Sequence, residues 1–380
     1  MALNVGLKYN LKKDYIFGFQ DFGSDNRSPD FADHVLVFMI RGLRKKWKQP
    51  VSYYFCKGTT KTQTLTSLII DIITAINETG LKVRATVSDQ GKTNVAAISN
   101  LLKITNQKMV SAGEVNKYVG YLVNNIEVVH IYDPPHLLKC VRNNLLTKNV
   151  TFIKDGNKYT ASWKYIVNLY ELDKKNELLE LRALPKLTDT HIYVDKMKKM
   201  KVSSAAQIFS QRVASTMKLM CNHDPSHTFL GDNALGTVEM ISFMDKLFDS
   251  VNGSSVYARD GKPLRCAVKN DSFHIQFWNE AINIFNSMFY IDKNGKETVP
   301  PNINPDCYNF MTSFKTLLIN NFASTKSISR NCQDDNCIGL LKNLASFLNT
   351  EHSNTDHSIS TLPVALQNPI NVFNPIQDMT

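Results

Sequence analysis

The sequence predicts an α/β protein in which a mixed β-sheet is followed by a mainly helical region. Strand-like apolar runs alternate with amphipathic helices between residues 51 and 146, an order typical of parallel strands joined by right-handed crossovers. A hairpin is predicted ahead of them, over residues 7–22, and its antiparallel strands make the sheet mixed. After about residue 160, apolar residues recur mainly at helical spacing.

The first elements follow from short local patterns. Residues 31–47 have helical apolar spacing and run into a basic segment at residues 41–48. Residues 51–56, VSYYFC, are rich in aromatic and β-branched side chains and predict a strand. Residues 60–79 predict a long amphipathic helix, because leucine and isoleucine recur every three or four positions and Gly80 stands just past the end.

The alternation then continues towards the middle of the chain. A strand is predicted over residues 82–89 and a helix over residues 93–102. The segment VVHIYDPPHLLKCVRNNLL predicts a buried strand over residues 128–132 and a basic amphipathic helix from Pro135. Its Asp-Pro-Pro corner ends the strand, since proline donates no backbone hydrogen bond.

The second half reads as helices separated by loops. Loop-rich stretches are predicted at residues 252–269 and 292–305, and the tail from residue 351 has the composition of a poorly ordered terminus. The predicted helices cover residues 163–181, 203–220, 236–250, 271–288 and 309–322.

Composition sets the broad class of protein. A chain of 380 residues with 43% hydrophobic side chains predicts a folded protein of two domains, or of one interrupted domain. The net charge of +10 favours an acidic partner, with nucleic acid the first candidate, although ordinary solubility charge is a serious alternative. No apolar run reaches eighteen residues, so no membrane span is expected. Seven scattered cysteines without a C-x-x-C pair fit reduced thiols in the cytosol or nucleus.

Two aspartates stand where α/β proteins place functional side chains, at the carboxyl ends of predicted strands. Asp89 lies in SDQGKTN, which is not a phosphate-binding loop because the required earlier glycine is Thr86. A strand-end carboxylate suits a hard divalent cation such as Mg²⁺, but a helix N-cap is an equally good interpretation. Asp133 precedes His136 at the Asp-Pro-Pro corner, and a structural histidine there is as probable as a functional one.

Six blocks, in order along the chain, resemble P-element-type DNA transposases, which join a ribonuclease-H-like catalytic domain to a GTP-binding insertion. They are VSDQGKTN, IYDPPHLLKCVRNNLL, LPKLTDTHI, KMKVSSAAQIFSQRVA, FMDKLFDSVN and NCQDDNC. The resemblance implies a ribonuclease-H-like mixed sheet over residues 1–150 and a mainly helical GTP-binding insertion over residues 151–325. It also implies a return helix of the core over residues 326–350 and a disordered tail over residues 351–380.

The resemblance assigns a partial catalytic set. Asp89 matches the second metal-binding aspartate of the family, and the first would stand just before Met1, so we expect the chain to lack the opening strand and to be marginally stable. The family's glutamate position is held by Cys337, and a thiol does not replace a carboxylate on Mg²⁺. Asp335 is a poor substitute for that glutamate, because it stands two positions earlier, and on a helix a side chain two positions earlier points in a different direction. Asp133 and His136 match the neighbourhood of the active site.

The residues that match the family's guanine-nucleotide contacts are more complete in this sequence than the catalytic set. Either matched aspartate suits the N1 and N2 donors of guanine, the lysines suit phosphate, and the phenylalanine suits stacking on the base, although each residue alone fits surface or core as well. The matched residues are Lys186, Lys201, Val202, Phe248, Asp249, Asn252 and Asp334.

Basic residues near the strand ends and after residue 40 are candidate contacts to DNA phosphates, although a solvated surface is the more probable role of each taken singly. They are Arg41, Arg44, Lys45, Lys46, Lys139 and Arg142.

These assignments predict a transposase fragment or domesticated derivative that binds GTP and DNA but is defective in strand transfer. No zinc-dependent DNA-binding domain or leucine zipper precedes residue 7, so we expect charge-driven DNA binding rather than recognition of transposon ends. A nuclear location is expected, and homo-oligomerisation is left open. The alternatives are an active metal-dependent integrase or nuclease with rearranged ligands, and a non-enzymatic DNA-binding regulatory protein.

Overall fold

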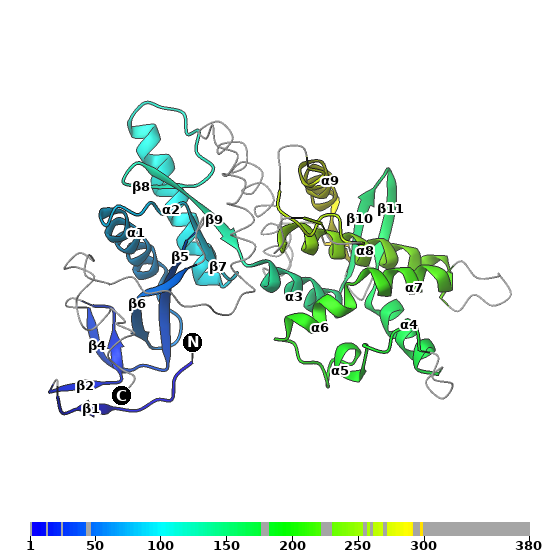
Figure 1. The fold of residues 1–380 in the computed structure, drawn as a ribbon, viewed down its shortest axis with the longest axis horizontal. Helices are drawn as coiled ribbons and strands as arrows, with labels where there is room; N and C mark the ends of the chain where they lie inside the picture. Colours follow the sequence, from blue (N-terminus) through cyan, green and yellow to red (C-terminus); the bar gives the residue numbers. More distant parts are fainter. Residues whose placement is uncertain are drawn as a thin grey trace. The chain divides into compact units, whose positions relative to one another are not determined.

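The computed structural model describes two compact units, one up to His130 and the other from Ile131 (Figure 1). Among the helices of the described residues, none is long and apolar enough to cross a membrane. The described residues are 2–12, 14–23, 26–42, 47–175, 182–221, 230–253, 257–258, 261–268, 272–291 and 297–298.

The first unit opens with the predicted hairpin. β1 (Lys8–Asn10) pairs antiparallel with β2 (Tyr15–Phe17), which confirms it. A four-stranded sheet follows, in the order β4-β3-β6-β5. Its strands are β3 (Phe19–Asp21), β4 (Arg27–Phe31), β5 (His34–Arg41) and β6 (Lys48–Cys56).

The helix predicted over residues 31–47 is wrong, because β5 occupies residues 34–41 of that segment. The run HVLVFMIR pairs antiparallel with β6 along its whole length, from His34 opposite Cys56 to Arg41 opposite Lys48. Valine, isoleucine and phenylalanine favour a pleated surface, and the pairing with β6 prevails over a helical apolar spacing that was only local.

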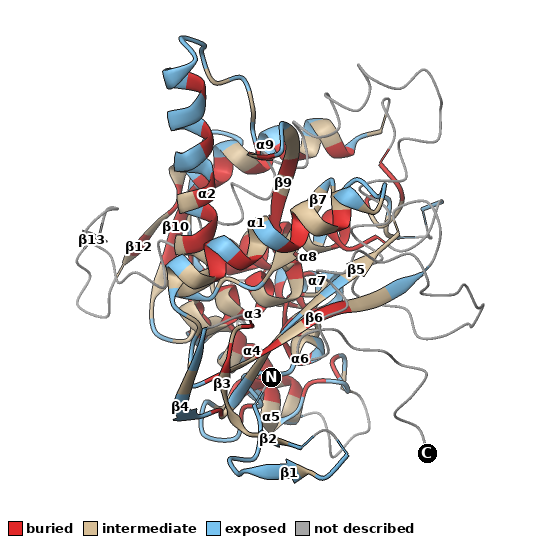
Figure 2. Ribbon diagram, turned by 90° about the vertical axis from the view of Figure 1, so that its left-hand side faces the viewer, coloured by how far each residue is buried: buried red, intermediate tan, exposed pale blue. Residues whose placement is uncertain are grey.

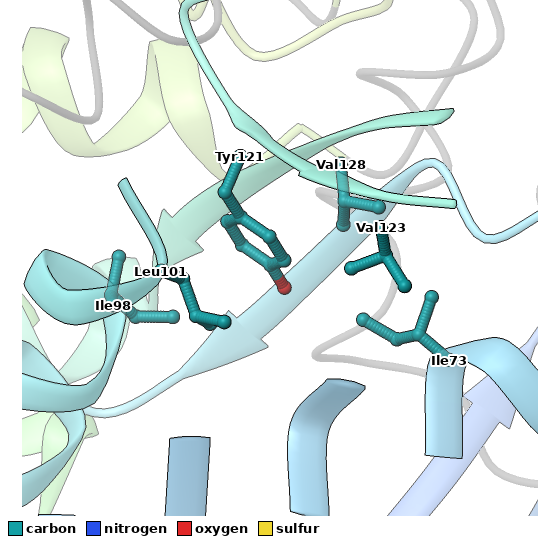
Figure 3. Packing of buried hydrophobic residues seen from close by; sticks show 6 residues of the cluster. All are labelled: Ile73, Ile98, Leu101, Tyr121, Val123 and Val128. Carbon is teal, nitrogen blue, oxygen red and sulfur yellow. The ribbon is translucent and has the colours of Figure 1, made fainter. Parts of the chain in front are cut away.

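α1 (Thr62–Glu78) joins two hydrophobic clusters of this unit. Its Leu68, Ile72 and Ile76 pack with Val51 and Tyr54 of β6. Its Ile73 belongs to the second cluster, together with residues of α2 (Lys92–Ser111), β8 (Tyr121–Val123) and β9 (Ile126–Tyr132). Figure 3 shows this second cluster, which consists of Ile73, Ile98, Leu101, Tyr121, Val123 and Val128.

β7 (Ala85–Ser88) belongs to a three-stranded sheet with the order β7-β9-β8. The backbone N–H of Val129 donates to the carbonyl of Arg84 at 3.0 Å, and Figure 3 shows the arrows of β7 and β9 pointing the same way. α2 lies between β7 and β8 in the chain, buries one face and exposes the other (Figure 2). The predicted strand, helix and strand are therefore confirmed, although α2 extends nine residues beyond its predicted end at residue 102.

The second unit combines helices with a sheet that the sequence did not predict. β10 (Asn149–Lys154) and β11 (Asn157–Ala161) form a hairpin, and the sheet order is β11-β10-β12-β13. β12 is Phe289–Ile291 and β13 is Glu297–Thr298. The long helices are α3 (Pro134–Leu145), α4 (Trp163–Lys175), α7 (Gln211–Cys221), α8 (Leu235–Val251) and α9 (His274–Ser287), with two shorter ones, α5 (Asp189–Ile192) and α6 (Val202–Ile208).

α8 is the central helix of this unit and lies directly on the hairpin. A Cβ atom at Gly236 would lie 2.3 Å from the carbonyl oxygen of Thr160, so only glycine permits this approach. Thr237 Oγ1 accepts from the backbone N–H of Ser162 at 3.0 Å. Thus α8 is fixed to β11 by backbone proximity as well as by side-chain packing.

The single helix predicted over residues 203–220 is also wrong. The first helix ends before Phe209, where ψ is 60°, and α7 begins two residues after Phe209. Ser210 Oγ accepts from the backbone N–H of Val213 at 3.4 Å, so its side chain caps the new helix. Apolar spacing continued across this break and concealed it.

Candidate guanine-nucleotide site and strand-end aspartates

Asp89 follows β7 and is exposed. Its Oδ1 accepts from the backbone N–H of Gly91 at 2.9 Å and from Asn94 Nδ2 at 2.6 Å. These bonds fold the chain into the turn that starts α2, as expected of an aspartate before a helix. Within the described residues no hydrogen bond engages Oδ2, which leaves that oxygen available to a cation.

The metal assignment needs more than this carboxylate. The described part of the chain contains no group of three histidine, cysteine, aspartate or glutamate side chains able to hold an ion. A single hard oxygen ligand fits the chemistry of Mg²⁺ but does not complete a site for it. Cys337 lies outside the described residues, so its assignment stays a prediction.

Asp133 begins α3 as its N-cap. Its Oδ2 accepts from the backbone N–H of His136 at 3.2 Å and lies 2.7 Å from His136 Nδ1, while Oδ1 is buried without a partner among the described residues. The cap and Pro134 at the first helical position account for the sharp strand-to-helix corner. Both residues therefore have structural roles, and their place beside an active site stays a prediction.

Two of the predicted DNA contacts in α3 are wrong. Arg142 is fully buried and Lys139 is 7% exposed, so neither presents its charge to a phosphate on the surface. Arg142 Nη2 donates to the carbonyl of Lys199, and its Nε donates to Asn143 Oδ1 at 3.0 Å. Arg142 therefore ties α3 to the segment just before α6. Of the other candidates, Arg44, Lys45 and Lys46 lie outside the described residues.

Lys186 stands on a turn that a buried ion pair builds. The turn runs from Leu184 to Leu187, whose backbone N–H donates to the carbonyl of Leu184 at 3.0 Å. Asp173, fully buried at the end of α4, accepts from Arg182 Nε at 3.1 Å and from the backbone N–H of residue 183 at 2.7 Å. Arg182 Nη2 donates to the carbonyls at both ends of the turn. The turn is therefore rigid, and Lys186 at its tip is exposed.

Lys201 stands at the N-terminus of α6. It is the N-cap position, it is exposed, and Val202 begins the helix. Its backbone N–H donates to the carbonyl of Lys198 at 3.0 Å, within the segment that Arg142 holds. Each lysine of the predicted phosphate contacts is thus exposed on a segment that an arginine side chain fixes, Arg182 for Lys186 and Arg142 for Lys201.

The predicted base contacts gather at the carboxyl end of α8. Phe248 is half-buried, Asp249 is 7% exposed and Asn252 is the C-cap residue at 6% exposed. The Oδ1 atom of Asn252 is buried and accepts no hydrogen bond within the described residues. The structure thus brings these three residues together, while Asp334 lies outside the described part.

The sequence reasoning missed the charged partners of Asp249. Lys262 Nζ lies 2.5 Å from Asp249 Oδ2 and 3.7 Å from Oδ1 of Asp245, one helical turn earlier. Arg265 Nε lies 3.9 Å from Asp249 Oδ1. Burial, with repulsion from Asp249 adding to it, raises the pKa of Asp245. The i, i+4 spacing of the two aspartates was a signal in the sequence, but nothing local linked them to the loop around residue 262.

Comparison with known proteins supports both units. Residues 1–102 match the family described as the TNP-like RNase H N-terminal domain, and residues 135–263 match the TNP-like GTP-binding insertion domain. The second match contains every predicted nucleotide contact except Asp334.

Two curated relatives are transposases. The chain is 25% identical over 275 residues to the DNA transposase THAP9 of Homo sapiens, and 30% identical over 224 residues to the Transposable element P transposase of Drosophila melanogaster. These alignments cover 68% and 58% of this chain, but only 27% and 26% of the relatives. The chain therefore spans about a quarter of each relative's length.

A solved structure has the same fold. The Drosophila P element transposase strand transfer complex matches with a TM-score of 0.65 at 22% identity, and the match covers 90% of this chain and 66% of that one. The ribonuclease-H-like α/β fold with its insertion is thereby confirmed.

Proposed function

Because this chain belongs to the P-element type of transposases, we propose that its insertion domain binds a guanine nucleotide and that the chain acts in a process derived from DNA transposition. The nucleotide is GTP in this proposal, DNA is the macromolecular partner, and the nucleus is the compartment where genomic DNA is met. Strand transfer is lost, because Cys337 stands where the family has a metal-binding glutamate.

The end of α8 carries the proposal. A carboxylate in the last turn of a helix is opposed by the helix dipole, and no basic residue of α8 offsets it in that turn. Asp249 nevertheless lies there, and the buried Oδ1 of Asn252, three positions on, has no partner in the described residues. Leaving a buried acceptor unsatisfied costs about 1–3 kcal/mol. A base with N–H donors satisfies the Asn252 oxygen and adds donors to Asp249, whose charge Lys262 and Arg265 already offset in part.

The two exposed lysines supply the phosphate end. Lys186 and Lys201 each offer a point charge on a rigid segment, which limits the entropy lost when a triphosphate binds. In this arrangement Phe248 lies against the base, and its half-buried ring serves the core as well.

An exchange of base specificity tests the nucleotide site. Asp249→Asn replaces a pure acceptor by an amide that still accepts from N1–H but donates to a 2-oxo group. We expect it to weaken GTP binding by about tenfold or more and to improve binding of xanthosine triphosphate, measured by isothermal titration. The matched control is Asp195→Asn, an exposed aspartate of the same unit.

The specificity switch separates function from folding. A variant that has merely unfolded loses both nucleotides, whereas a switched site gains one. Saturable GTP binding that is unchanged in Asp249→Asn would contradict the proposed site, as would no GTP binding by the unaltered chain.

Loss of catalysis is tested separately. We expect no cleavage or strand transfer of transposon-end DNA by this polypeptide with Mg²⁺ or Mn²⁺, in gel assays that detect nicked and joined products. Metal-dependent joining would instead support the alternative of rearranged ligands around Asp89.

A further inference from the structure

Lys262 lies between two carboxylates at the proposed base-binding end of α8. Its Nζ is 2.5 Å from Asp249 Oδ2 and 3.7 Å from Asp245 Oδ1. The side chains of the two aspartates are 10% and 15% exposed, whereas that of Lys262 is 36% exposed. The ammonium group therefore covers the buried acids from the solvent side, where a ligand must approach Asp249.

The backbone around Lys262 is held in place. The N–H of Arg265 donates to the carbonyl of Lys262 at 3.1 Å, which closes a turn. Two residues on, the carbonyl of Leu264 lies 2.7 Å from Nε2 of buried His274, at the start of α9. Gly261, with φ +74°, permits the bend before the turn. The lysine side chain can swing, but its anchor stays beside α8.

The chemistry of guanine decides what the lysine does when the base arrives. Guanine presents O6 as an acceptor next to the N1 and N2 donors, so a carboxylate that accepts from N1 and N2 has O6 at its side. Asp249 Oδ2 is already taken by the ammonium, so base and lysine compete for that oxygen. Expelling Lys262 into solvent would remove the cation that lies 3.7 Å from Asp245 and leave Asp249 with the more distant Arg265, whose Nε is 3.9 Å from Oδ1, which is costly for partly buried carboxylates.

We propose that Lys262 is a specificity-determining residue of the nucleotide site: it releases Asp249 to the base, stays beside Asp245, and donates to guanine O6. This inference rests on the proposed function and extends it to a residue outside the predicted contacts. Adenine carries an amino donor at the corresponding position, which the ammonium repels. Lys262 thereby selects guanine from one side of the base edge while Asp249 selects it from the other.

Base analogues that differ at one position test this division. 6-Thio-GTP keeps both donors but replaces O6 by a poor acceptor, and inosine triphosphate keeps O6 but lacks the N2 amino group. Binding of GTP and both analogues is measured by isothermal titration for the unaltered chain and for Lys262→Met. We expect the unaltered chain to prefer GTP over 6-thio-GTP by about tenfold or more, the size expected of a hydrogen bond to a charged group.

In Lys262→Met we expect weaker GTP binding and loss of the preference over 6-thio-GTP, with the preference over inosine triphosphate retained. Lys262→Arg, which restores a cationic donor, should recover part of the preference for GTP over 6-thio-GTP. Lys246→Met, an exposed lysine of α8, is the control and should change neither preference. A thermal melt establishes that each variant is folded.

Two results would overturn the proposal while leaving the GTP site intact. One is an unchanged preference over 6-thio-GTP in Lys262→Met, which makes the ion pair purely structural. The other is tighter GTP binding by Lys262→Met, which makes the lysine a competitor only. Failure of the unaltered chain to bind GTP would instead overturn the proposed function, and this inference with it.

Discussion

His130 is a buried histidine whose protonation opposes folding. It is 4% exposed, with Nδ1 3.0 Å from Thr86 Oγ1 and Nε2 3.3 Å from Ser88 Oγ, so it bridges β9 to β7. Burial lowers the pKa of His130 to about 3, because the charged ring loses its hydration. Such hydroxyl partners satisfy a neutral ring but do not balance a charge.

A loss of stability in acid follows from this pKa. Between about pH 6.5 and pH 3 the unfolded chain binds a proton at this histidine that the folded chain does not. Each unit of pH lowered within the window removes up to about 1.4 kcal/mol from the free energy of unfolding. We expect His130→Gln to flatten this dependence in urea titrations between pH 7.5 and 4.5. Exposed His34→Gln is the control, and equal slopes in His130→Gln and the unaltered chain would contradict the assignment.

Asp173 governs the turn that presents Lys186. We expect Asp173→Asn to lower the free energy of unfolding by about 3 kcal/mol, because it removes the buried carboxylate that pairs with Arg182 and accepts from the backbone N–H of residue 183. The substitution should also weaken the binding of GTP more than the binding of guanosine, since the turn presents Lys186, a proposed phosphate contact. Calorimetry and nucleotide titration measure the two effects.

Asp189→Asn is the matched control for this experiment. Its carboxylate pairs with Lys174 and Lys196 but is 31% exposed, so we expect Asp189→Asn to lower the free energy of unfolding much less than Asp173→Asn does. Equal destabilisation by both substitutions would show that burial does not distinguish the two pairs.

At the scale of elements, predictions succeeded where a local signal sufficed. α1 and α3 were predicted because periodicity, Gly80 and the Asp-Pro-Pro corner mark them within a few residues. β5 was missed because only its pairing with β6 distinguishes it from a helix. The partners of Asp249 were missed for the same reason, since the fold brings Lys262 back to α8 from thirteen positions further on in the chain.

The contact between α8 and β11 gives a test at this scale. We expect Gly236→Ala to lower the free energy of unfolding by about 3 kcal/mol or more, because the added methyl meets the backbone of Thr160 and the helix must shift. Gly6→Ala is the control, since a Cβ there has no atom within 4 Å. Similar melting temperatures for both variants would contradict the close approach.

At the scale of the whole molecule, charge dominates the expected behaviour towards DNA. The net charge of +10 favours phosphate contacts, while burial of Arg142 and Lys139 removes two cations from the surface that makes them. The DNA binding that we propose for the remaining surface should therefore depend on salt and little on sequence.

We expect the affinity for duplex DNA to fall by at least tenfold between 50 and 200 mM salt, and equally for unrelated sequences, because binding releases counterions. Fluorescence anisotropy with two labelled duplexes measures this. A salt-resistant preference for one sequence would show specific recognition within this chain.

α1 has a consequence for the dynamics of the first unit, because one helix contributes to both hydrophobic clusters there. Neither sheet can open its core without stripping apolar surface from the same helix. Amide protons of α1 should therefore exchange with solvent last, and at one common rate, whereas those of the β1–β2 hairpin exchange early. In this unit the slowest-exchanging protons will thus mark the helix rather than either sheet.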